Sequence, residues 1–253
     1  MSGHSKWSTI KHQKGIADAK RSKLFTKAAR EITVAARSGG PDPVMNARLR
    51  LAVDRARHDN MPLDNIDRAI KRGAARGGDA SADLEEVVYE GFGPSGTAIL
   101  VMAFTDNRNR SASEIRRVFD RNGGKMGQVG TVSYLFDQRG VITLELDPEK
   151  AEDVALLAID RGAEDFTIDG PVLEIVSPVD SFEGLRQGLE AEGLTLANAE
   201  IAMVPKTLLL LEERHAEQAI RLLDRLEDLD DVQKVFSNAD FPTELLEKLG
   251  DAA

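Results

Sequence analysis

The 253-residue sequence contains no cysteine, one tryptophan and two tyrosines, and aromatic residues make up only 5% of it. Without cysteine the chain has no disulfide, no thiolate metal ligand and no cysteine nucleophile, so nothing indicates an oxidising compartment. The longest apolar run, 98–104, is much shorter than a membrane span, and no signal-type apolar stretch follows the N-terminus. We therefore expect a cytoplasmic protein with no membrane partner.

Residue patterns typical of catalytic and metal sites are also missing. The four histidines, at positions 4, 12, 58 and 215, have no metal-ligand spacing. Carboxylates are numerous, but they are scattered over helix faces and turns, where solvation explains them. Neither a G-x-S-x-G motif nor a Walker loop is present. We expect no enzymatic activity, no catalytic residues, no metal, no cofactor and no small-molecule substrate.

One glycine-rich stretch, 91–96, matches the dinucleotide-binding pattern G-x-G-x-x-G. That pattern binds a pyrophosphate only where a helix follows and presents its N-terminus. Here a second strand pattern follows, and Pro94 suits a hairpin. We therefore interpret the stretch as a turn between two strands.

Charge is distributed unevenly along the chain, whose net charge is -10. Residues 1–76 contain 17 Lys and Arg against 7 Asp and Glu, a net charge of +10, which leaves 16 and 36, or -20, for residues 77–253. A polyanion attracts the basic part and repels the acidic part. We therefore expect nucleic acid to bind at the N-terminal part of the molecule.

The first thirty residues concentrate the positive charge, with Asp18 as their single acid. At 100° per residue, four cations share one face of a helix whose opposite face carries Leu24, Phe25, Ala28 and Ile32. The segment before that helix has few apolar residues and is interpreted as an arm, in which Trp7 could stack on a base. The predicted nucleic-acid contacts are Lys6, Trp7, Lys11, Lys14, Lys20, Lys23, Lys27 and Arg30.

Two other interpretations of this basic segment remain open. A basic run is often only a solvated helix face. An N-terminus that contains Arg and Ser and is poor in acids also resembles an organelle transit peptide, although the basic stripe continues into a helix with an apolar face instead of ending at a cleavage site.

Hydrophobic periodicity predicts helices first and a mixture of strands and helices afterwards. Residues 1–76 predict three helices: the second begins at Asp42-Pro43 with Met45 facing inward, and the third has Leu63 inward and ends at Gly73. Strands are expected at 87–89, 97–104, 131–136, 141–146, 165–168, 172–176, 199–204 and 232–237, with Gly140 as a turn. Further helices are expected from the capping box Ser111 to Glu114 onward and at 148–161, 181–192 and 215–229.

The order of these elements predicts the domain organisation. Residues 137–204 follow the order β-α-β-β-α-β of a ferredoxin-like unit, and the flanking segments could form a second such unit. We predict an α+β protein with an N-terminal three-helix domain (1–76) followed by two ferredoxin-like α+β domains. One of these, 137–204, is inserted in the other, which consists of 77–136 and 205–253.

Two further segments could contribute contacts. The polar hexapeptide 105–110 lies between a strand and a helix, a position typical both of function and of ordinary turns, and Arg108 and Arg110 are possible secondary contacts. The second and third helices could form a helix-turn-helix. The acids Asp64 and Asp67 stand, however, where a recognition helix would approach phosphates, which disfavours base readout by that helix.

The sequence resembles the YebC family along nearly its whole length. The resemblance lies in long and unusual motifs at 1–7, 10–12, 25–27, 30–37, 60–62, 66–73, 89–94, 105–110, 130–136 and 235–238. It implies three domains, an N-terminal helical one, a split α+β one and an inserted α+β one, in a cytoplasmic gene-expression factor. The family is not known for a set of catalytic residues, so none is transferred.

The resemblance leaves two functions open. Family members are commonly described as probable DNA-binding transcriptional regulators, which predicts a non-enzymatic regulator of transcription. Mitochondrial relatives act as translational activators and bacterial members have been linked to translation, which predicts instead a ribosome-associated factor that binds ribosomal RNA. A nucleic-acid-processing enzyme would need a metal-binding carboxylate cluster, and the sequence shows none.

Overall fold

The computed structural model describes residues 18–75, 84–242 and 245. Its N-terminal unit consists of α2 (Asp18–Gly39), α3 (Ala47–His58) and α4 (Leu63–Ala74). The apolar faces of the three helices meet in one core that includes Ile32, Leu49, Val53 and Ile66. Helices α2 and α4 pack so closely that a Cβ atom added to Gly73 would lie 2.3 Å from the carbonyl oxygen of Thr33.

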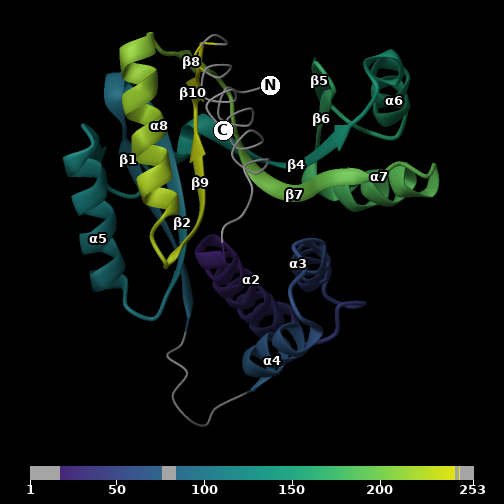
Figure 1. Ribbon diagram of the computed structural model, residues 1–253, viewed down its shortest axis with the longest axis horizontal. Coiled ribbons are helices and arrows are strands. Elements are labelled where there is room, and N and C mark those ends of the chain that lie inside the picture. Colours follow the sequence, from purple (N-terminus) through teal and green to yellow (C-terminus); the bar gives the residue numbers. More distant parts are fainter. Residues whose placement is uncertain (1–17, 76–83, 243–244, 246–253) are drawn as a thin grey trace.

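The first sheet has the strand order β3-β1-β2-β9, with antiparallel neighbours. Its strands are β1 (Glu85–Phe92), β2 (Ala98–Thr105), β3 (Lys125–Met126) and β9 (Val232–Ser237). Helices α5 (Arg108–Arg121) and α8 (Glu213–Glu227) cover one face (Figure 1). Strand β2 is buried on both faces, which accounts for its continuous apolar run.

The second sheet has the order β5-β6-β4-β7, again with antiparallel neighbours. Its elements along the chain are β4 (Phe136–Glu145), α6 (Pro148–Asp160), β5 (Asp165–Asp169), β6 (Val172–Ser177), α7 (Val179–Ala191) and β7 (Leu196–Pro205). This order and pairing describe a ferredoxin-like unit, in which the first and last strands, β4 and β7, are neighbours. Outside both sheets, β8 (Leu209–Leu210) pairs with β10 (Ala239–Asp240).

The long pair β4 and β7 also joins the two α/β units. Phe136 and Val132 pack with Leu100 and Phe236 on the face of the first sheet that α5 and α8 leave uncovered. The second unit therefore rests on the first through a shared apolar cluster. Figure 1 shows α2 below the ends of β2 and β9, with the helices α3 and α4 beside it.

The α+β class with three N-terminal helices, predicted from the sequence, is confirmed. The domain boundaries at 76, 136 and 204 stay a prediction. Among the described residues, no helix combines the length and the apolar character needed to cross a bilayer. The glycine-rich stretch 91–96 leads through a short 3-10 turn, η1 (Pro94–Gly96), directly into β2.

Several predicted elements are wrong in detail. The strand expected at 131–136 is a loop with a 3-10 turn, η2 (Ser133–Leu135), and the sheet takes the two-residue β3 instead. Gly140 is not a turn but lies inside β4, where a Cβ atom would come within 2.3 Å of the Phe182 ring. Glycine is required there for close packing, which its neighbours in the sequence do not reveal.

Helix boundaries that differ from those predicted include the starts of α3 and α5 and the end of α4. Helix α3 begins at Ala47 because the Asn46 side chain accepts a hydrogen bond from the Leu49 amide, and Met45, expected inside, is 82% exposed. Helix α5 begins at Arg108 with Asn107 as its cap, so Ser111 is a buried residue of the first turn. Leu63, expected inside, is exposed, and Gly73 lies within α4 instead of after it.

Candidate nucleic-acid interface

The predicted cationic face of α2 does not point into open solvent. Lys23 donates a hydrogen bond to the backbone oxygen of Asp228, and its Nζ lies 3.7 Å from the Asp228 carboxylate. Lys27 Nζ donates to the backbone oxygen of Glu227 at 2.7 Å. These acceptors lie at the C-terminal end of α8, where free carbonyls and the helix dipole attract cations. This part of the face is therefore partly covered within the molecule.

Arg30, the last residue of that face, binds a buried carboxylate. Its Nη1 lies 3.0 Å from Oδ1 of Asp231, which is 6% exposed. The other oxygen of Asp231 accepts hydrogen bonds from Ser111 Oγ at 2.6 Å and from Arg110 Nη2 at 2.9 Å. Burial alone would raise the pKa of Asp231, but the hydrogen bonds from Arg110 and Ser111 outweigh it and lower that pKa. Asp231 thus anchors α2 to the first α/β unit.

Arginines of α3 extend the same pattern of pairing. Three of them contact acids of the α/β units: Arg48 with Glu86 at 2.8 Å, Arg50 with Glu183 at 3.0 Å and Arg55 with Glu200 at 2.9 Å. Much of the positive charge of the N-terminal unit is therefore neutralised within the molecule. These three arginines therefore need no outside partner to balance their charge.

Glu200 joins all three units. Its carboxylate on β7 accepts from Arg55 of α3 and, at 2.7 Å, from Lys234 of β9. Burial would raise the pKa of Glu200, but the charges of Lys234 and Arg55 lower it to about 2. Glu200 is therefore ionised under all ordinary conditions and acts as a structural anion.

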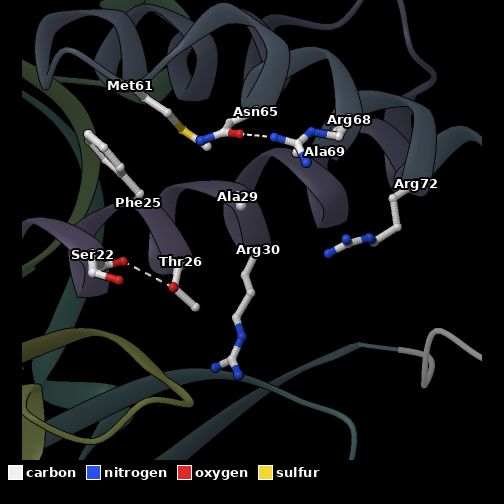
Figure 2. A pocket seen from close by; sticks show the side chains of 10 residues that line it. All are labelled: Ser22, Phe25, Thr26, Ala29, Arg30, Met61, Asn65, Arg68, Ala69 and Arg72. Carbon is white, nitrogen blue, oxygen red and sulfur yellow. Dashed lines mark hydrogen bonds between the residues drawn. The ribbon is translucent and has the colours of Figure 1, made fainter.

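A cleft of about 560 Å³ opens between α2 and α4. Figure 2 shows its walls: the ring of Phe25 projects from α2 toward Met61, while Arg68 and Arg72 extend from α4. Its lining consists of Ser22, Phe25, Thr26, Ala29, Arg30, Met61, Asn65, Arg68, Ala69 and Arg72. Three of these side chains are guanidinium groups, and none of the described lining residues carries a carboxylate.

The two arginines of α4 form no ion pair with an acid among the described residues. Arg68 donates to the backbone oxygen of Asp64 at 3.1 Å and to the side-chain oxygen of Asn65. Arg72 has no hydrogen-bond or ion-pair partner within the described part of the chain. An arginine presents five N–H donors, so both side chains retain donors for an anion. Arg30, in contrast, points away from α4 toward Asp231 (Figure 2).

Half of the predicted contacts cannot be placed on the N-terminal unit. Lys6, Trp7, Lys11 and Lys14 lie outside the described residues, and so does the side chain of Lys20. The structure brings Lys23, Lys27 and Arg30 together, but against the turn after α8.

The possible secondary contacts, Arg108 and Arg110, are both paired. Arg108 forms an ion pair with Glu85, and Arg110 forms ion pairs with Asp106 at 2.7 Å and Asp231 at 2.9 Å. Whether either side chain also contacts nucleic acid stays a prediction.

Sequence reasoning missed Arg68 and Arg72. Their spacing, four residues apart and in register with Asn65, is a signal for one shared helix face. The neighbouring acids Asp64 and Asp67 obscure that signal, because they make the start of α4 look unfavourable for phosphate. Within the described ranges, no group of three or more metal-ligating side chains is present.

Comparison with known proteins gives a consistent result along the chain. Residues 5–76 match the TACO1/YebC protein N-terminal domain, and residues 84–239 match the TACO1/YebC second and third domain. A probable transcriptional regulatory protein of Dehalococcoides mccartyi is 50% identical over 248 residues, covering 98% of each chain. One of Chloroflexus aurantiacus is 51% identical over 249 residues, covering 97% of this chain and 98% of its own.

A solved structure shares the fold. The crystal structure of a conserved hypothetical protein from Aquifex aeolicus is 44% identical and superposes with a TM-score of 0.85, covering 94% of this chain and 97% of that one. The chain therefore belongs to the TACO1/YebC family.

Proposed function

We propose that this protein is a non-enzymatic, cytoplasmic regulator of gene expression that binds nucleic acid through its N-terminal unit. The names of its relatives, probable transcriptional regulatory proteins, support a role in transcription with DNA as the partner. The proposed contacts are the cations of the N-terminal segment and of α2, with Trp7 as a stacking residue. To contact phosphates, Lys23, Lys27 and Arg30 would have to leave the acceptors that they now bind at the end of α8 and in the turn after it.

The observation that supports this proposal best is the cleft between α2 and α4. Three guanidinium groups border it and no described lining residue is acidic, although the chain as a whole carries a net charge of -10. Arginine is well suited to phosphate, because its planar donors can bind two oxygens at once. Arg68 and Arg72 thus give the N-terminal unit basic surface that ion pairing within the described residues leaves unused.

Salt-dependent binding tests the proposal. Fluorescence anisotropy with a labelled 20-base-pair DNA duplex, measured between low and high salt, gives the slope of log K against log salt. Each cation that no longer neutralises a phosphate should reduce that slope by about 0.9. The double variant R68Q/R72Q should flatten the slope, while the matched variant R116Q/R117Q on the exposed face of α5 should not. Binding of this duplex and of single strands that is undetectable or independent of salt would contradict the proposal.

A second candidate, a translation factor that binds ribosomal RNA, is favoured by one observation. Asp64 and Asp67 are exposed at the start of α4, where a helix entering a DNA groove would meet phosphates. Sedimentation of native lysate through a sucrose gradient at low salt separates the candidates. A translation factor should travel with ribosomes, and a DNA-binding regulator should stay near the top of the gradient.

A further inference from the structure

We infer that the cleft between α2 and α4 binds one unstacked nucleotide of single-stranded nucleic acid, with the base against Phe25 and a phosphate on Arg72 and Arg68. This inference rests on the proposed function and deepens it, because it names the part of the nucleic acid that is bound. The cleft holds about 560 Å³, within the range of pockets for small ligands.

One end of the cleft is apolar. The Phe25 ring is half-buried and packs against the helical core on one side, while Figure 2 shows it projecting between α2 and α4 beside Met61. Ala29 and Ala69 form the floor, and neither adds bulk. Every base offers a flat apolar face, so an aromatic ring anchored in this way is a suitable stacking surface.

Uncharged polar groups also line the cleft. They are the hydroxyls of Ser22 and Thr26 on α2 and the amide of Asn65 on α4. Uncharged groups of this kind bind base edges or sugar hydroxyls. Figure 2 shows Phe25 and Met61 at one end of the cleft and Arg72 toward the other, so apolar surface and positive charge occupy different parts of it.

The two helices touch at one end of the cleft. Gly73 contacts the Thr33 backbone so closely that a Cβ atom would lie 2.3 Å from its oxygen, and Thr33 Oγ1 also donates to the Ala69 carbonyl at 3.2 Å. We expect a single flipped-out base to enter the space between the helices, whereas a duplex would contact only the arginines at its rim.

The test uses the full chain and three labelled probes: U12, dT12 and a 20-base-pair DNA duplex. Wild-type protein should bind one or both single strands more tightly than the duplex. Phe25→Leu should weaken single-strand binding at least about 5-fold, the lower limit for stacking on an aromatic ring, and leave the salt slope unchanged. Phe25→Tyr, which keeps the ring, should restore affinity. Arg72→Gln should reduce the salt slope by about 0.7, and Arg116→Gln should have no effect.

Photocrosslinking with 5-iodouridine in U12 gives an independent measurement. Crosslinks should map to the tryptic peptide 24–27, which contains Phe25. Crosslinks confined to the peptide with Trp7 would overturn the inference. It would also be overturned if Arg72→Gln bound with wild-type affinity and Phe25→Tyr bound no better than Phe25→Leu. In both cases the wild-type protein would still bind nucleic acid in a salt-dependent way, so the proposed function would stand. If the wild-type protein showed no salt-dependent binding at all, the proposed function would be contradicted too. Thermal melts check that each variant is folded.

Discussion

Glu90 is a buried acid that three backbone amides bind. Its carboxylate is 4% exposed and accepts hydrogen bonds from the amides of Gly130 at 2.7 Å, Val132 at 2.7 Å and Ser133 at 2.9 Å. The loop 127–135 replaces the strand that its sequence predicts, because this carboxylate satisfies the backbone donors that a sheet would otherwise pair. A loop held in this way carries Tyr134 and Val129 on the surface.

Replacing Glu90 by glutamine should destabilise the protein in a pH-dependent way. Burial raises the pKa of Glu90, but the three backbone donors outweigh it and lower that pKa below its ordinary value of 4.5. A lowered pKa means that the ionised group stabilises the fold above about pH 4.5 and that this contribution is lost as the pH falls through the folded-state pKa. At pH 7 the change should cost about 2 kcal/mol, within the range for hydrogen bonds to a charged group.

Urea unfolding of both proteins at several pH values checks this expectation. The difference between wild type and Glu90→Gln should shrink as the pH falls below 4.5, because the wild-type carboxyl then becomes neutral as well. Glu145→Gln, at an exposed strand end, should change the free energy of unfolding by less than about 0.5 kcal/mol. A difference that stays constant down to about pH 3 would show that ionisation of Glu90 does not matter.

At the scale of elements, the contact between α2 and α4 shapes the N-terminal unit. Gly73 lies near the end of α4, where a Cβ atom would overlap the Thr33 oxygen and come within 2.8 Å of the Ala36 Cβ. The sequence pattern suggests that this glycine ends the helix. The structure shows that Gly73 permits the two helices to touch. This contact depends on both helices, so the sequence of one helix alone does not reveal it.

Two glycine-to-alanine changes should therefore have opposite effects. In a helix interior, alanine is normally more stable than glycine by roughly 0.5–1 kcal/mol. Gly184 in α7 has no atom within 4 Å of an added Cβ, so Gly184→Ala should stabilise the protein by about that amount. Gly73→Ala should instead destabilise it by about 1–3 kcal/mol, the usual cost of overpacking. Thermal melts of both variants test the contrast, and an equal stabilisation by both would refute the close contact.

The elements that could be predicted are those whose signal is local. The helix after Asp147-Pro148 and the strand 232–237 follow the predicted bounds within one residue, because a cap or an alternating pattern lies in the segment itself. Met45, Gly140 and Ser111 differ from prediction for the opposite reason. Their environments depend on Asn46 as a competing cap, on the Phe182 ring and on Asp231. Contacts across the chain of this kind leave no periodic pattern.

At the scale of the whole molecule, charge separation along the chain contributes to cohesion between the units. The sequence suggests a basic part and an acidic part that act separately. In the structure, Arg30, Arg48, Arg50 and Arg55 pair with acids of the α/β units, so opposite charge helps hold the units together. The family and the basic character of the N-terminal unit could be predicted from sequence. The sequence could not predict which of its cations pair within the molecule and which stay available to a ligand, because this depends on how the units dock.

The turn after α8 should compete with nucleic acid for α2. If Lys23 and Lys27 contact phosphates, they must leave the acceptors at 227–231 that they now occupy. The carboxylates of Asp228 and Asp230 lie 3.7 and 3.9 Å from Lys23 and are largely exposed, so each contributes at most about 1 kcal/mol to stability. The double variant D228N/D230N should therefore remain folded and bind nucleic acid several-fold more tightly at low salt, with a gain that fades as salt screens the charges.

Two matched variants decide whether this gain comes from the α2 face. E152Q/D153N removes the same charge from an exposed part of α6, so an equal gain there would reveal a general effect of net charge. Adding K23Q/K27Q to D228N/D230N should abolish the gain, because the cations whose charge the two carboxylates offset are then absent. Since Lys23 and Lys27 bind the end of α8, thermal melts must show that this quadruple variant stays folded before its affinity is compared. Unchanged affinity in D228N/D230N would mean that these lysines only fasten the N-terminal unit in place, and that nucleic acid is bound by the cleft and the N-terminal segment without them.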